Sequence, residues 1–159
     1  MPAVHKDEFG KEYPITSLGN FKNALSAKHI FFAPGSQYTK VNNRAFQTEG
    51  GTIPALEGVY LPESINYIGD YAFYYAVSIK HLSDKFYKEN IDGHLSNNIT
   101  HIGKEAFRGQ LLQKGAFHIN ELPEKLVSLG EGAFNNAGDN ILCTVLPANL
   151  SSIPNYAFA

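Results

Sequence analysis

The 159-residue chain has only one cysteine, Cys143, so an internal disulfide is excluded and the fold must be stabilised by packing. No stretch reaches the roughly 18 apolar residues of a membrane-spanning helix, and residues 1–8 lack the apolar run of a signal peptide. Lysine and arginine form no cluster, and the formal net charge is -2. Nucleic-acid-binding modules usually gather these residues into a basic face, so we expect no nucleic-acid partner and no membrane span.

The composition favours a folded domain, with 43% hydrophobic and 18% charged residues. Its most informative feature is an internal repeat. Leucine opens four aligned segments, aliphatic residues follow four and seven positions later, and Ala-Phe closes each one. The four segments are Leu61–Phe73, Leu95–Phe107, Leu122–Phe134 and Leu146–Phe158, and Pro34–Phe46 is a weaker fifth copy.

The closing phenylalanines Phe46, Phe73, Phe107, Phe134 and Phe158 are 27, 34, 27 and 24 residues apart, which is typical of stacked supersecondary units. The length varies only between one Ala-Phe and the next opening leucine, so residues 83–92 are expected to bulge from one side. We assign residues 34–159 to the repeats. Residues 1–33 are an N-terminal cap or a degenerate first repeat, because residues 15–20 imitate residues 65–70 without a following Ala-Phe.

Within each block the apolar spacing alone would match an amphipathic helix, but Gly69, Gly103 and Gly130 fall in its middle. We therefore predict two short extended segments followed by a single helical turn that carries Ala-Phe and is capped by Asp70 or Asn155. The glycine position is predicted to be a turn of variable geometry, since Pro154 takes the same place. The phenylalanines are predicted to stack between coils as a continuous aromatic spine.

The pattern Leu-Pro-x-x-Ile-x-x-Ile-Gly-x-x-Ala-Phe resembles the leucine-rich repeat of the BspA-like family, from about residue 34 to 159. The resemblance implies a right-handed solenoid with a parallel β-sheet on one face and short strands and single helical turns on the other. It also implies surface proteins that adhere to host matrix proteins or to other cells. The family commonly has a cysteine three residues after the phenylalanine. Here that position holds Glu49, Ala76, Gln110 and Ala137, and the third copy has Ser96 in place of proline.

The sequence contains no recognisable catalytic, cofactor-binding or metal-binding motif, so we expect a non-enzymatic protein without cofactors. Its histidines include no pair with zinc-ligand spacing, and Cys143 lies in a predicted buried strand without a neighbouring histidine or acid. His101 occupies the same repeat position as Lys40, Tyr67, Ser128 and Ser152, a mixture that predicts a solvent-exposed site. Asn98 and Asn149 begin glycosylation sequons at a position that needs a polar turn residue in any case.

A binding face is expected on the strands that precede the opening leucines. With Val59 and Leu61 inward, Tyr60 points outward, because strand side chains alternate. Repeat equivalence would place further side chains in line with Tyr60, and these predicted partner contacts are His94, Glu121 and Val145.

Two function classes follow. The first is a protein-binding module of a cell-surface or secreted adhesion protein, with a protein or glycoprotein ligand. The second is an intracellular scaffold or regulatory domain in the cytoplasm, and a repeat segment that serves an enzyme elsewhere in a longer chain is a third reading. Because the chain stops on Ala157-Phe158-Ala159 without a polar cap, we expect either a piece of a longer repeat protein or a last repeat that stacks on a partner, for example by end-to-end self-association.

Overall fold

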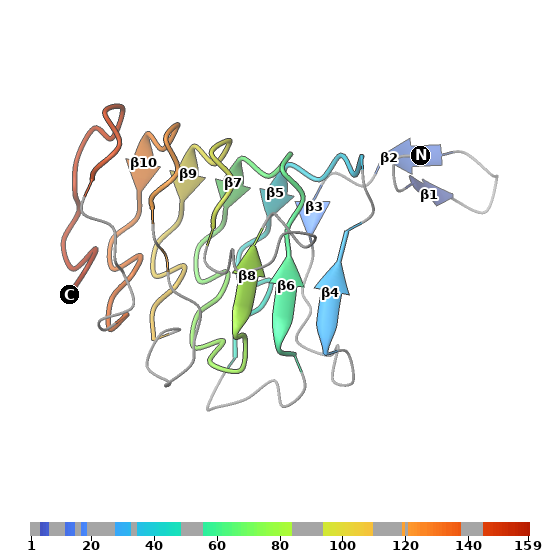
Figure 1. The fold of residues 1–159 in the computed structure, drawn as a ribbon, viewed down its shortest axis with the longest axis horizontal. Coiled ribbons are helices and arrows are strands. Elements are labelled where there is room, and N and C mark those ends of the chain that lie inside the picture. Colours follow the sequence, from blue (N-terminus) through green and yellow to red (C-terminus); the bar gives the residue numbers. More distant parts are fainter. Residues whose placement is uncertain are drawn as a thin grey trace.

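In a computed structural model, the chain winds into coils that stack side by side along one axis (Figure 1). The structure describes residues 28–32, 35–48, 56–82, 94–109, 119, 121–137 and 145–159, and the backbone alone of residues 4–6, 12–14, 17–18 and 83. No helix occurs within these ranges. The strands are β1 (Val4–Lys6), β2 (Glu12–Pro14), β3 (Ser17–Leu18), β4 (His29–Phe31), β5 (Lys40–Val41), β6 (Gly58–Tyr60), β7 (Tyr67–Ile68), β8 (His81–Ser83), β9 (His101–Ile102) and β10 (Ser128–Leu129).

A parallel five-stranded sheet in the order β10-β9-β7-β5-β3 joins equivalent positions of successive repeats. Val41 pairs with Ile68, and Ile68 pairs with Ile102, so the same apolar position of each block lies side by side. These residues are buried, whereas the residue before each of them faces outward. The predicted parallel sheet of short strands is therefore confirmed, and its register follows the repeat.

A second parallel sheet, in the order β4-β6-β8, is formed by the segments that come before the opening leucines. It lies on a different side of the coils from the five-stranded sheet (Figure 1). β3 and β4 continue the two sheets toward the N-terminus, beside β5 and β6 respectively, and β1 and β2 form a separate antiparallel pair. The boundary between a cap and the repeats at residue 33 stays a prediction.

The closing phenylalanines form a continuous stack through the described coils. Ring centroids are 4.9 Å apart for Phe46 and Phe73, 5.2 Å for Phe73 and Phe107 and for Phe107 and Phe134, and 5.5 Å for Phe134 and Phe158. The planes of neighbouring rings differ by no more than 10°. The predicted aromatic spine is confirmed, and the first four rings are fully buried.

The last coil exposes apolar positions that earlier coils bury. Leu122 and Leu129 are 5% and 7% exposed, whereas the equivalent Leu146 and Ile153 are 49% and 53% exposed. Phe158 is 39% exposed because no ring among the described residues covers its outer face. End-to-end association through this surface stays a prediction.

The segment that carries Ala-Phe is a tight turn, and the prediction of a helical turn was wrong. The amide of Ala72 donates to the carbonyl of Gly69 at 3.3 Å, which closes a four-residue turn, and Tyr71 at its third position has a φ of 57°. A positive φ at that position is typical of a type II β-turn and is incompatible with a right-handed helix. The equivalent residues Arg44, Glu105, Gly132 and Tyr156 also have positive φ.

Hydrogen bonds between coils explain why the turn is not helical. The amide of Tyr71 donates to the carbonyl of Lys104 at 2.8 Å, and the amide of Phe73 donates to Ala106 at 2.7 Å. A helix would use such amides within its own turns. Asp70, which was predicted to cap its own turn, instead accepts a hydrogen bond at 2.8 Å from the amide of Lys104 in the next coil. The backbone amides of the turn and the carboxylate of Asp70 therefore form hydrogen bonds with the neighbouring repeat.

The glycines in the middle of the blocks are required for close approach between coils. Gly69, Gly103 and Gly130 have ordinary φ angles. A Cβ atom added to Gly103 would lie 2.5 Å from the backbone nitrogen of Asp70 in the preceding coil. Backbone at that distance leaves no room for a side chain, so glycine sets the spacing of the stack.

Pro154 takes the glycine position in the last coil and changes the pairing there. In the preceding coil the amide of Gly130 donates to the carbonyl of Ile102 at 2.8 Å. Proline has no amide hydrogen for the equivalent bond. Accordingly, β10 is the last strand of the five-stranded sheet within the described residues.

Phe107→Ala is expected to lower the free energy of unfolding by about 3–5 kcal/mol, because it deletes a fully buried ring from the middle of the stack. Phe158→Ala is expected to cost much less, since that ring is 39% exposed. Urea titration of the two variants measures both losses, and equal losses would contradict an ordered stack.

Gly103→Ala is expected to destabilise the protein by about 1–3 kcal/mol, because the new methyl group meets backbone that cannot move independently. Ser128→Ala, at an exposed position of the same sheet, is the control and should stay within about 0.5 kcal/mol of the parent. The same titration compares them. A Gly103→Ala protein as stable as the control would disprove close approach at this position.

Candidate binding surface on the three-stranded sheet

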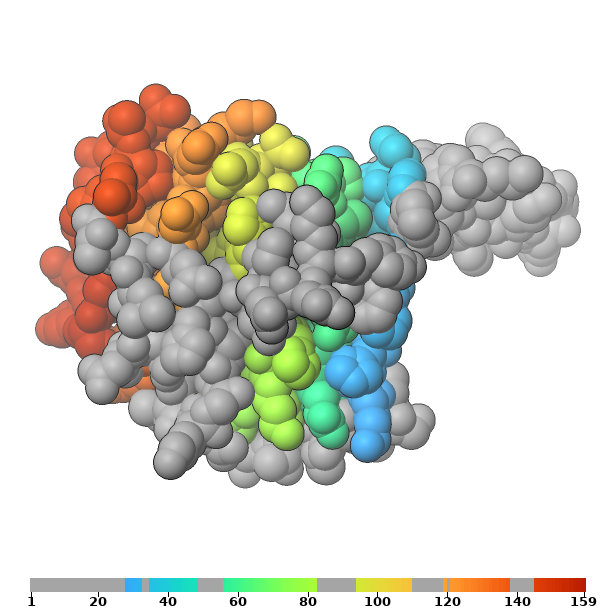
Figure 2. Space-filling model, in the orientation of Figure 1, coloured from blue at the N-terminus to red at the C-terminus, as the bar shows by residue number. Residues whose placement is uncertain are grey.

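The outer face of the three-stranded sheet carries a group of ring-bearing side chains. Val59 and Leu82 are fully buried, and Ile30 packs against the core, so the residues beside them in each strand point outward. In Figure 2 the strands β4, β6 and β8 lie at the front of the molecule, in blue, green and yellow-green. The outward-facing described residues are His29, Phe31, Gly58, Tyr60 and His81.

Four of these residues form one contiguous surface, named here the aromatic surface: His29, Phe31, Tyr60 and His81. The rings of Phe31 and Tyr60 stack with centroids 4.7 Å apart and planes 12° from parallel. The ring of His29 lies 5.9 Å from that of Phe31 and 6.1 Å from that of Tyr60. Phe31 is 49% exposed, so a large part of this ring group remains accessible.

Gly58 allows the histidines to approach across the middle strand. It pairs in register with His29 on one side and His81 on the other, and their ring centroids are 6.3 Å apart. A Cβ atom on Gly58 would lie 2.5 Å from Nδ1 of His29 and 3.0 Å from Cε2 of Tyr60. A side chain at this position would therefore displace the rings that cover it.

A charged pair lies beside the aromatic surface, just before β4 and β6. Nζ of Lys28 is 3.8 Å from Oε1 of Glu57, and the two side chains are 72% and 38% exposed. Ring-bearing side chains in the centre and charged ones at the edge are the arrangement found in protein interfaces. The surface can contribute apolar contact area and directional polar contacts.

Of the predicted contact residues, Tyr60 lies in the aromatic surface and His94 does not. The sheet pairs Tyr60 with Phe31 and with Ser83, the last residue of β8. Repeat equivalence had placed His94 in line with Tyr60, and that alignment was wrong. In this repeat the strand precedes the longer connecting segment 84–93, so the residue next to the opening leucine is not the strand residue.

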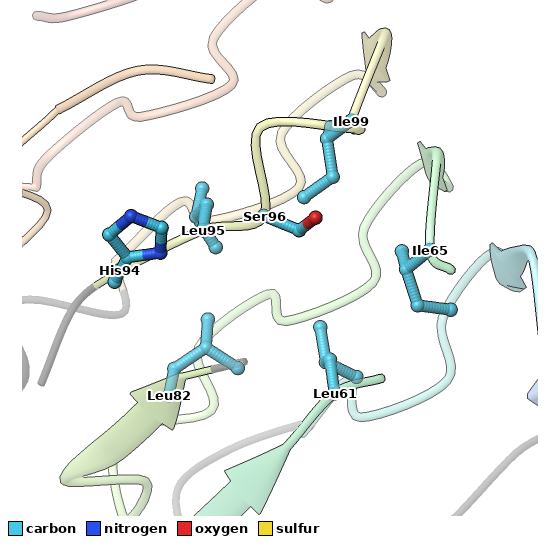
Figure 3. A pocket seen from close by; sticks show the side chains of 7 residues that line it. All are labelled: Leu61, Ile65, Leu82, His94, Leu95, Ser96 and Ile99. Carbon is cyan, nitrogen blue, oxygen red and sulfur yellow. The ribbon is translucent and has the colours of Figure 1, made fainter. Parts of the chain in front are cut away.

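His94 instead lines a small cavity between two coils, together with Leu61, Ile65, Leu82, Leu95, Ser96 and Ile99 (Figure 3). The cavity measures about 10 Å³, which is about the smallest volume that holds one water molecule. Glu121 and Val145 are exposed, Val145 to 77%, but neither belongs to a strand. Their role as partner contacts, like that of Tyr60 and His94, remains a proposal.

Three members of the aromatic surface were not predicted from the sequence. His29 and Phe31 precede the first strong block, where no opening leucine marks the register, and His81 lies far from its own opening leucine. A weak signal was available: an aliphatic residue follows His29, Gly58 and His81 alike. Only the strand pairing brings these segments together.

The outer face of the five-stranded sheet has a different character. His101 is exposed, as its repeat position predicted, and its ring stacks 5.7 Å from that of Tyr67. Nζ of Lys40 lies 4.4 Å from the centroid of Tyr67. Lys40 and Ser128 flank Tyr67 and His101 in this row, so its rings are confined to two neighbouring strands.

Within the described ranges, no three histidine, cysteine or acidic side chains come together as metal ligands would. In the same part of the chain, no helix has the length and hydropathy needed to cross a bilayer. Cys143, predicted to lie in a buried strand, falls outside the described residues.

Comparison with known families decides the classification. The family described as BspA type leucine-rich repeat region (6 copies) matches residues 12–91 and 83–159. The chain belongs to this BspA-type leucine-rich repeat family. Searches of curated proteins and of solved structures gave no match. The match begins upstream of the first block recognised in the sequence, and it includes the strands β3 and β4.

Membership of the BspA-type family fixes the general character of the protein. Repeats of this kind typically bind proteins, are generally non-catalytic and are typical of surface proteins. The parallel sheets of short strands described above are consistent with a leucine-rich-repeat solenoid.

Phe31→Ala and Tyr60→Ala are expected to be coupled by about 0.5–1.5 kcal/mol in a double-mutant cycle, because each ring loses the same stacked partner. Thermal or urea unfolding of the parent, the two single variants and the double variant measures this coupling energy. Tyr67→Ala paired with Phe31→Ala is the control and should show additive losses, since Tyr67 lies on the other sheet. Additive losses for Phe31 and Tyr60 would refute the stacked pair.

Proposed function

We propose that this BspA-type module is the ligand-binding part of a cell-surface adhesion protein. Its ligand is a protein or glycoprotein of a host matrix or of another cell, and the aromatic surface is the contact face. The observation that carries the proposal is the stacked, partly exposed pair Phe31 and Tyr60, which lies beside the neighbouring rings of His29 and His81. Such rings bury much apolar area and lose little conformational entropy on binding.

The ligand chemistry follows from the surface. Apolar or aromatic side chains of the partner would pack beside Phe31, and hydrogen-bonding groups would meet the histidine rings and the hydroxyl of Tyr60. The exposed pair Lys28 and Glu57 would contribute more to orientation than to affinity, because exposed ion pairs have small net free energies.

Binding of the purified protein to immobilised matrix glycoproteins tests the proposal. Phe31→Ala and Tyr60→Ala are each expected to weaken binding by about tenfold or more, the usual effect of removing an aromatic anchor. Tyr67→Ala, a ring on the other sheet, is the matched control and should bind like the parent. Circular dichroism confirms that each variant is folded.

Glu121 was predicted to contact the partner, but it lies outside the aromatic surface. Comparing the binding of Glu121→Ala with that of Phe31→Ala and Tyr60→Ala therefore distinguishes the aromatic surface from the other predicted contact residues. Unchanged binding by folded Phe31→Ala and Tyr60→Ala variants would eliminate this face. Binding to proteins of the producing cell's own cytoplasm, with no affinity for matrix glycoproteins, would favour the alternative of an intracellular scaffold or regulatory domain.

A further inference from the structure

The turns of successive coils build a second row of side chains, away from the aromatic surface. The third turn position, which has a positive φ in every described copy, holds Arg44, Tyr71, Glu105, Gly132 and Tyr156. Neighbours in this row interact: the guanidinium carbon of Arg44 lies 5.2 Å from the ring centroid of Tyr71. Gly132 is the one described member without a side chain, so the row is interrupted between Glu105 and Tyr156.

A groove of about 300 Å³ lies at this interruption, and its lining residues are Glu105, Arg108, Glu131, Gly132, Asn135 and Tyr156. That volume is at the lower end of the range for small-molecule sites. A Cβ atom on Gly132 would lie 3.2 Å from Cγ of Glu105 and 3.6 Å from Cβ of Asn135. The groove is therefore shaped by the missing side chain, and a larger residue at Gly132 would fill it.

The charges that line the groove are already paired. Nη1 of Arg108 donates to Oε2 of Glu105 at 2.9 Å, and Nζ of Lys104 donates to Oε2 of Glu131 at 3.2 Å. The hydrogen bond with Glu131 raises the pKa of Lys104 above its ordinary value. A charged ligand would have to compete with these pairs, and a neutral polar ligand would not.

The remaining features favour a ligand with many hydroxyl groups and an apolar face. Carboxylates accept hydrogen bonds, a carboxamide both donates and accepts, and a guanidinium only donates. The groove can therefore both accept a hydrogen bond from a ligand hydroxyl group and donate one to it. Nε of Arg108 is buried and has no partner within the described residues. The ring of Tyr156 is 66% exposed at the edge of the groove and offers a flat apolar surface.

We propose that this groove binds a neutral saccharide of one or two rings. Its hydroxyl groups bond to Glu131, Asn135 and the outer edge of the Arg108–Glu105 pair, and its C–H face packs on Tyr156. The site is separate from the aromatic surface and would give the module a second, small-molecule specificity.

The repeat itself supplies the variant that tests this site. Arg44, Tyr71, Glu105 and Tyr156 occupy the equivalent position of other coils with φ between 48° and 61°. Gly132 has a φ of 61°, so a side chain there is compatible with the turn. Asparagine tolerates this conformation best among non-glycine residues, and Gly132→Asn should fill the groove without unfolding the protein.

The experiment is saturation-transfer NMR and calorimetric titration of the folded protein with galactose, mannose, N-acetylglucosamine and lactose. At least one of these sugars is expected to bind, and both Gly132→Asn and Tyr156→Ala are expected to weaken binding by about tenfold or more. Arg44→Ala, in the same row but outside the groove, is the matched control and should bind like the parent. Thermal midpoints establish that the variants are folded.

Absence of binding to all four sugars, or equal binding by the parent and both groove variants, would overturn the proposal. Binding of a neutral tripeptide with the same sensitivity to Gly132→Asn, in place of the sugars, would overturn the ligand class. Sugar binding that persists in Phe31→Ala and Tyr60→Ala variants would support a site that is independent of the proposed adhesion surface.

Discussion

Successive coils are held at one repeat distance by two sets of contacts that must agree with each other. Stacked phenylalanine rings are 4.9–5.5 Å apart, and neighbouring strands of a sheet are separated by about 4.7–4.9 Å. The amides of the turns donate across the same interval, as from Phe73 to Ala106 at 2.7 Å. Gly103 permits this spacing because backbone of the preceding coil occupies the place of a side chain. Packing and backbone hydrogen bonding therefore reinforce one another along the stack.

This spacing also determines what kind of surface the protein can present. Equivalent residues of adjacent coils lie side by side, so outward positions form rows whose members contact one another. Glycines interrupt two of these rows with opposite results. Over Gly58 the rings of His29 and His81 close toward each other, whereas beside Gly132 the carboxylate of Glu105 is held by Arg108 and a groove remains open. Whether the surface over a glycine is covered or open therefore depends on the contacts that the neighbouring side chains make.

The candidate site was only partly predictable from the sequence. Tyr60 was found because strand alternation beside a buried leucine is a local property. His94 was misplaced and His29, Phe31 and His81 were missed, because strands of the second sheet pair across connections of unequal length. The turn was misjudged for a related reason. Its apolar spacing suits a helix, but its amides bond to the next coil, and a single repeat gives no sign of that partner.

The sequence by itself determined the repeat, its buried positions and the aromatic stack, since each block meets the same surroundings and keeps the same apolar residues. It also indicated the family, because five aligned copies of one pattern are specific. Only the tertiary structure decided the geometry of the turns, the second sheet and the contacts among outward side chains. Those features depend on which residues of different coils lie next to each other. The length of the connecting segments sets that alignment, and the stacking contacts leave the outward side chains free to vary.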